Sequence, residues 1–225
     1  MPRSLQTFFL LIIISAVVAA QAQNEAQTPA EPAPAVTFTL DFPASQPAHY
    51  SIRTQSDGVS HYHSSGRISA DSEDTDSFDL DFTALPETRQ KIFALAAKAE
   101  YFQKDVDLHH KSLAFTGKKT LAYKDAQHSG ESTFIYTNNS AVLELTALMQ
   151  SLSTTLEFGH RLQYDLHYQK LALDEELKHM DDLAHSHDLI ELNAIRPILD
   201  QLIADPGVIN VTRARAQRLL ERAAH

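Results

Sequence analysis

The sequence of 225 residues contains no cysteine, no tryptophan and only 6 glycines. The missing cysteines exclude disulfide bonds, cysteine-ligated zinc or iron–sulfur centres, thiol nucleophiles and lipid-modified cysteines. The chain shows no Walker loop, no dinucleotide-binding fingerprint and no G-x-S-x-G motif around a nucleophilic serine. We therefore expect neither a catalytic residue nor a cofactor.

Positive charge is also scarce, since 19 Lys and Arg face 29 Asp and Glu, for a formal net charge of -10. Nucleic-acid binding depends on clustered Lys and Arg, so this acidic balance argues against a nucleic-acid partner. The hydrophobic content of 43% is that of a folded chain rather than a disordered one.

The longest apolar run lies at the N-terminus. Residues 1–22 are predicted to be a secretory signal peptide, with Arg3 in its basic region, an apolar run over 8–20 and a small-x-small cleavage site at Ala20-Gln21-Ala22. A membrane-spanning helix needs about 20 apolar residues, so we expect cleavage and no transmembrane segment afterwards. Residues 23–35 are polar and proline-rich, which predicts a flexible leader.

Alternation of apolar and polar residues predicts an antiparallel sheet in residues 36–138. The pair Asp57-Gly58 suits the positive φ angles of a tight hairpin. Pro86 opens a helix, with Ile92 and Ala96 in its apolar stripe, which we expect to cover one face of the sheet. The expected strands are 36–42, 50–55, 59–63, 77–82, 112–116, 119–124 and 131–137, with hairpin turns at 116–118 and 127–130.

Residues 139–225 are expected to be helical. Asn139 or Ser140 caps a long helix whose apolar stripe loses phase near Gly159, where we expect a bend or a stop. The predicted fold class is thus α+β: an antiparallel sheet packed on one helix, followed by an all-α tail. Three later helices are expected, and the first of them begins at Asp174. The second begins at Asp188, with Glu191 at capping-box spacing, and Pro197 either kinks it or marks its true start. The third begins at Asp205-Pro206.

Several short segments follow one another in a recognisable order. They are Tyr50-Ser51-Ile52, Ser56-Asp57-Gly58, a phenylalanine-rich strand, a helix with Ile92 and Phe93 that ends near Phe102, a Gly117-Lys118-Lys119 hairpin and a final helix. In this order, residues 49–157 resemble a class of uncharacterised exported bacterial domains that combine a sheet with helices. The resemblance implies a small binding or inhibitor module, but it brings no catalytic signature.

Histidine is the over-used reactive residue, with 12 copies. His61 and His63 lie on one face of a predicted strand, and this spacing can chelate zinc if a neighbouring strand brings a third ligand. His49, His109 or His110 are the candidate third ligands. Exposed strand residues beside a hairpin give the same pattern, so metal binding is the alternative here and not the expectation.

Two Glu-x-x-His pairs match the spacing of di-iron helical bundles, which also need two further inward carboxylates. The pairs are Glu157 with His160 and Glu176 with His179, and Glu144 and Glu191 are the further carboxylates. The apolar stripe of the second helix leaves His179 on its solvent side, so solvated helix faces are the expectation.

Two other polar clusters have ordinary interpretations. His185 and His187 are weak metal candidates between two predicted helices, where polar residues usually serve as caps. The acidic run over residues 71–76 lacks the spaced oxygen ligands, the central glycine and the terminal glutamate of a calcium loop, so it predicts a solvated loop.

These observations favour a non-catalytic binding module of the cell envelope, exported to the periplasm or beyond the cell, whose partner is another envelope or secreted protein. A histidine-based metal-binding protein or metal-dependent enzyme is the alternative, with His61, His63, Glu157, His160, His185 and His187 as candidate ligands. An envelope protein with a purely structural role is a third possibility.

Overall fold

The computed structural model describes residues 33–67, 75–109, 112–186 and 188–223. The predicted signal peptide, most of the predicted leader, the greater part of the acidic run, His110 and His187 lie outside these residues. Over the described part of the chain, no helix combines the length and the apolar character that a membrane span requires.

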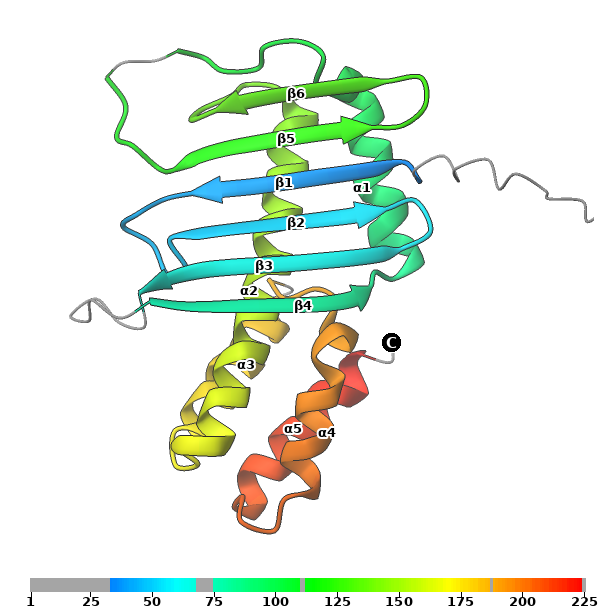
Figure 1. The fold of residues 1–225 in the computed structure, drawn as a ribbon. Helices are drawn as coiled ribbons and strands as arrows, with labels where there is room; N and C mark the ends of the chain where they lie inside the picture. Colours follow the sequence, from blue (N-terminus) through cyan, green and yellow to red (C-terminus); the bar gives the residue numbers. More distant parts are fainter. Residues whose placement is uncertain (1–32, 68–74, 110–111, 187, 224–225) are drawn as a thin grey trace, which may run out of the picture. The chain divides into compact units, whose positions relative to one another are not determined.

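The strands form one antiparallel sheet of six strands in the order β4-β3-β2-β1-β5-β6 (Figure 1). Strand β1 lies at the centre, where Phe38 pairs with Ile52 on one side and Leu121 on the other. The strands are β1 (Ala35–Asp41), β2 (His49–Gln55), β3 (Val59–Arg67), β4 (Thr75–Thr83), β5 (Lys118–Lys124) and β6 (Ser129–Phe134).

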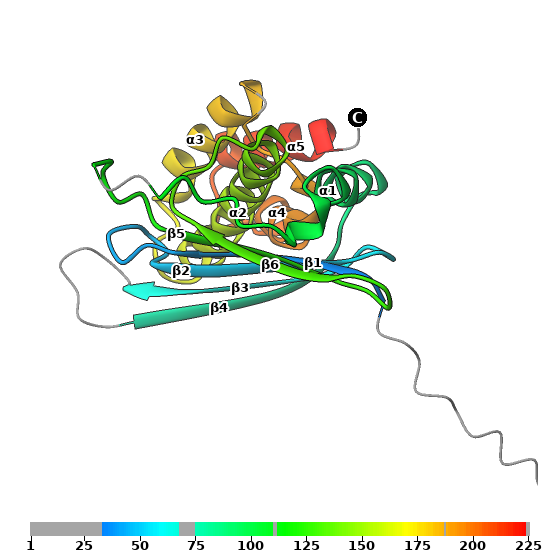
Figure 2. The same cartoon turned by 90° about the horizontal axis from the view of Figure 1, so that it is seen from above.

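Within the described part of the chain, the helices cover one face of this sheet and leave the other face open (Figure 2). The alternation in β1 explains the division, because Val36, Phe38 and Leu40 are buried whereas Thr37 and Thr39 on the other face are only half-buried. A polar outer row and an apolar inner row make one pairing register much more favourable than a shifted one.

The Asp57-Gly58 hairpin is confirmed, with Gly58 at a φ of 98° between β2 and β3. The strand expected over 112–116 is wrong. Its side chains Leu113 and Phe115 are 47% and 51% exposed, so this short apolar alternation finds no sheet face to cover. Strand β5 pairs with β1, and not with residues 112–116 in the hairpin that the sequence predicted.

The long helix α2 (Ser140–Tyr168) crosses the covered face of the sheet beside α1 (Pro86–Lys98). Asn139 caps α2, since its side chain accepts from the N–H groups of Ala141 and Val142. The stop expected at Gly159 is wrong, because α2 runs through this residue without interruption.

The tail contains the helices α3 (Leu173–His185), α4 (Arg196–Ala204) and α5 (Asn210–Ala223), and a 3-10 turn, η2 (Leu192–Ile195), precedes α4. Pro197 marks the true start of the third predicted helix. The expected helix start at Asp205 is wrong, because Asp205 ends α4 and its carboxylate accepts from the N–H of Gly207 in the turn before α5.

Glu191 overturns the predicted capping box. Its backbone has a φ of 59°, and its buried carboxylate accepts from the N–H of Leu85 at 3.0 Å, just before α1. Tail and sheet region therefore share contacts, and their buried apolar side chains form one continuous core. The predicted α+β class, with helices following an antiparallel sheet, is confirmed.

Candidate functional site

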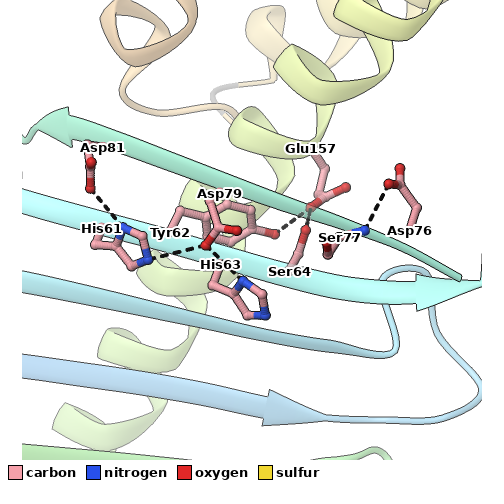
Figure 3. A network of polar contacts seen from close by, with 9 residues as sticks. All are labelled: His61, Tyr62, His63, Ser64, Asp76, Ser77, Asp79, Asp81 and Glu157. Carbon is pink, nitrogen blue, oxygen red and sulfur yellow. Dashed lines mark hydrogen bonds and ion pairs between the residues drawn. The ribbon is translucent and has the colours of Figure 1, made fainter.

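Strand β3 presents polar side chains to both faces of the sheet. Because successive side chains of a strand alternate, Tyr62 and Ser64 point toward α2, whereas His61 and His63 lie on the open face (Figure 3). Two separate polar groups result, and each needs its own interpretation.

On the covered face, the carboxylate of Glu157 in α2 is the centre of a buried network. Its Oε1 atom accepts from the Tyr62 hydroxyl at 2.7 Å and from the Ser64 Oγ at 2.6 Å (Figure 3). The Ser153 hydroxyl, one turn earlier in α2, lies 3.0 Å from the Tyr62 hydroxyl. These contacts join α2 to β3 and fix the position of the carboxylate.

The network controls the charge of its members. Burial raises the pKa of Glu157, but contact with His160 and the hydrogen bonds from Ser64 and Tyr62 outweigh this effect and lower the pKa below its ordinary value. Burial and the negative charge of Glu157 raise the pKa of Tyr62 far above its ordinary range. At neutral pH the site thus holds a carboxylate anion beside a protonated phenol.

His160 connects this buried carboxylate to the surface. Its Nε2 atom lies 3.1 Å from Asp76 of β4, and its Nδ1 atom lies 3.7 Å from Glu157. The ring stacks on Phe78, with centroids 4.3 Å apart and planes 5° from parallel. Packing and two carboxylates together hold the imidazole in one orientation.

Asp76, Glu157 and His160 line a cleft of about 620 Å³ between the segment before β2, the end of β3, the start of β4 and the last turns of α2. This volume falls in the range of about 300–1,000 Å³ that is typical of ligand sites. Tyr164 and Tyr168 line the cleft one helical turn apart, with ring centroids separated by 4.9 Å, and both are exposed. Asp165 lies between these two tyrosines in the sequence, and burial and the charge of Glu176 raise its pKa.

On the open face, three histidines each contact an aspartate carboxylate through the Nδ1 atom. His61 lies 2.7 Å from Asp81, and His63 lies 2.9 Å from Asp79, in both cases across the β3–β4 pair. His49 of β2 makes the corresponding contact of 2.6 Å with Asp41 of β1. The structure therefore brings His49 to the same face as His61 and His63, as the sequence allowed.

The other predicted ligands are dispersed. His109 lies between Asp105 and Asp107, and His185 contacts Arg222 of α5. Of the di-iron candidates, Glu157 and His160 belong to the cleft, Glu176 pairs with Arg161, Glu144 pairs with Lys91, and Glu191 accepts from Leu85. Among the residues with a described position, no group of three or more His, Asp or Glu side chains could hold a metal ion.

Sequence reasoning missed Tyr62, Ser64 and Ser153, and it assigned Asp76 to a solvated loop although this residue lies in β4. The alternation of β3 places Tyr62 and Ser64 on the face opposite His61 and His63, so their inward orientation had a signal. Their contact with Glu157 had none, because 93 residues separate Ser64 from Glu157 in the sequence. Asp79 and Asp81 were also missed as histidine partners, although the β4 alternation places them opposite Phe78 and Leu80.

No known protein family matches the chain, and no curated protein sequence is significantly similar to it. Function must therefore be inferred from the chemistry of the cleft and of the open sheet face.

Proposed function

We propose that this protein is a non-catalytic binding module of the cell envelope, and that the cleft beside α2 receives part of another envelope or secreted protein. The observation that carries the proposal is the cleft itself, in which Glu157, His160 and Asp76 are held in fixed orientations beside exposed tyrosine rings. Fixed polar groups next to aromatic surface are typical of recognition sites.

The chemistry of Glu157 supports binding over catalysis. A general base works best when its pKa lies near the operating pH, whereas the pKa of Glu157 lies below its ordinary value, which makes the carboxylate a weak base. The adjacent Ser64 hydroxyl donates a hydrogen bond to that carboxylate and is buried, with 3% of its surface exposed, so a substrate cannot easily reach it.

Site-specific photo-crosslinking in the native envelope tests the proposed site. A photoreactive phenylalanine analogue at Tyr168, on the rim of the cleft, is expected to capture a discrete protein partner. The same analogue at Leu143, an exposed position in the first turn of α2 outside the cleft, is the matched control. Capture that is no stronger at Tyr168 than at Leu143 would contradict this proposal.

Export forms part of the same proposal and has its own measurement. If residues 1–22 are removed on export, the mature protein begins at Gln23 and is found in the periplasm or in the medium. Cell fractionation with mass spectrometry of the N-terminal peptide checks both statements. A cytoplasmic protein that keeps residues 1–22 would contradict the envelope location.

A further inference from the structure

Strand β4 forms one edge of the sheet and has one neighbouring strand. In the described part of the chain, β3 pairs with it over residues 75–83, and no segment pairs with its outer side. At the opposite edge, the chain after α1 runs along β6, where the N–H of Val106 donates to the Ser132 Oγ at 3.2 Å (Figure 1). Apart from the N–H of Ser77, which donates to Asp76, the outer side of β4 offers backbone groups for a further strand.

The alternation of β4 gives its two faces different chemistry. Phe78 and Leu80 lie on the face that the helices cover, and both are only half-buried. Asp79 and Asp81 lie on the open face, with 59% and 88% of their side chains exposed (Figure 3). A strand that joined this edge would therefore meet apolar side chains on one face and carboxylates on the other.

The two carboxylates give this edge a negative charge. His63 contacts Asp79 and His61 contacts Asp81, and a neutral imidazole that donates an N–H leaves the carboxylate ionised. A proton on His61, which reaches both carboxylates, would still leave the pair net negative. Strand β4 contains no Lys or Arg, and β3 separates it from Arg53 of β2.

This charge selects among the possible occupants of the edge. A second copy fits poorly, because antiparallel pairing of two β4 strands around Leu80 places Asp79 of one copy opposite Asp81 of the other. Like charges directly opposite each other destabilise a strand pair. Residues 23–34 of the same chain are also a poor match, because they contain Glu25 and Glu31 and no basic residue. A basic segment of another protein is complementary.

We propose that the outer side of β4 binds an extended segment of a partner protein as a seventh strand, with Lys or Arg at every second position. The basic side chains meet Asp79 and Asp81 on the open face, and the apolar side chains between them cover Phe78 and Leu80. In this mode of recognition, main-chain hydrogen bonds supply affinity and alternate side chains supply specificity. The edge is a separate surface from the cleft, so the result of crosslinking at Tyr168 does not decide it.

Binding of a synthetic octapeptide that alternates Lys and Val tests the edge, by fluorescence anisotropy at low ionic strength. We expect a Kd of about 10–100 μM for the full-length mature protein. An octapeptide that alternates Glu and Val, and one in which the same four Lys and four Val are reordered as Lys-Lys-Val-Val repeats, should bind at least about tenfold more weakly.

Replacement of the carboxylates should reduce the affinity for the Lys-Val peptide. The double variant Asp79→Asn and Asp81→Asn is expected to weaken binding about tenfold or more, because it removes both charges that face the lysines. Glu131→Gln is the matched control, since Glu131 is an exposed carboxylate on β6, the other edge strand, and binding should change by less than about twofold. Equal affinities of the two variants would overturn the assignment of the basic positions.

Two measurements on the unaltered protein remove any dependence on variants. Because alternate N–H groups of a strand point to the same side, N-methylation of either the lysines or the valines should abolish peptide binding, and methylation of the other set should preserve it. Bound peptide should also slow hydrogen exchange in residues 75–83 and leave residues 129–134 unchanged. The proposal is overturned if the Lys-Val peptide binds no more tightly than the other two peptides, if both methylated peptides bind alike, or if the protection lies outside β4.

Discussion

Burial raises the pKa of two carboxylates inside this protein, yet their net pKa shifts are opposite. Glu157 receives hydroxyl donors and contacts His160, which lowers its pKa below the ordinary value of 4.5. Glu191 receives an N–H from Leu85 and a bond from Thr88, but burial dominates and raises its pKa. The number and the polarity of the donors, rather than burial alone, decide which way each group shifts.

Loss of the Glu157 carboxylate is expected to destabilise the fold. Glu157→Ala removes two hydrogen bonds to a charged acceptor and leaves the Tyr62 hydroxyl with fewer partners, which should cost about 3–5 kcal/mol of unfolding free energy. Urea denaturation measures the change. Glu144→Ala is the control, because Glu144 lies on the same helix in an exposed pair with Lys91, and it should change stability by less than about 1 kcal/mol. Equal losses in both variants would show that the network adds nothing.

The two carboxylates should also give opposite pH dependence. The lowered pKa of Glu157 stabilises the fold above its ordinary value of 4.5, and this contribution is lost as the pH falls through the folded pKa. The raised pKa of Glu191 stabilises the fold below 4.5, and this contribution is lost as the pH rises through the folded pKa. Glu157→Gln should therefore cost more stability at neutral pH than in acid, and Glu191→Gln more in acid than at neutral pH. Urea unfolding of each variant and of the unaltered protein, at about pH 3.5 and pH 7, measures how the cost in unfolding free energy changes with pH. If this cost changed in the same direction with pH for both variants, the opposite pKa shifts of Glu157 and Glu191 would be refuted.

At the scale of elements, the close packing of η2 against α2 depends on the missing side chain of Gly159. A Cβ atom at Gly159 would lie 2.5 Å from the Cγ2 atom of Ile195 in η2. The missing side chain lets η2 approach the helix closely. Gly159 thus serves packing between elements, although glycine in a helix costs about 1 kcal/mol relative to alanine.

Gly159→Ala is therefore expected to destabilise the protein in spite of its better helix propensity. Overpacking of about 1–3 kcal/mol exceeds the gain of about 1 kcal/mol, for a net loss near 1 kcal/mol. In the Ile195→Ala background, where the clashing methyl group is gone, the same change should be stabilising. Thermal and urea unfolding of the four proteins in this cycle check the reversal of sign. Thr154→Ala, at an exposed position of α2, is expected to stay within about 0.5 kcal/mol.

At the scale of the described molecule, sheet and tail depend on the same helix. Helix α2 packs against α1 and β2, and it also packs against α3, η2 and α4 of the tail. Its side chains Leu162 and Leu166 are buried. The link from Glu191 to Leu85 adds a second connection between the tail and the start of α1.

Sheet and tail should consequently unfold together. Tyrosine signals in near-ultraviolet circular dichroism and the helical signal in the far ultraviolet should follow one denaturation curve with a common midpoint. A chain that ends at Leu171 should lose this cooperative transition, because it exposes the apolar face of α2 that α3 and η2 cover. An early separate loss of helix in the full chain, or a cooperative transition in the shortened one, would show that the sheet region folds independently.

The sequence by itself determined the elements whose signals are local. The alternation of β1, the Asp57-Gly58 hairpin and the cap at Asn139 each depend on a few neighbouring residues, and all three are present in the fold. Export, the envelope partner and the division near residue 138 stay predictions, because nothing in the described structure bears on them.

Tertiary structure alone decided the contacts between distant segments. Glu191 looked like part of a capping box, yet it folds back to Leu85, and Gly159 looked like a break in a helix that in fact continues. The cleft arises for the same reason, since β3, β4 and α2 contribute to it from different parts of the chain. Local patterns specify the preferred conformation of a segment, whereas the partner of a buried polar group depends on which segments the core brings together.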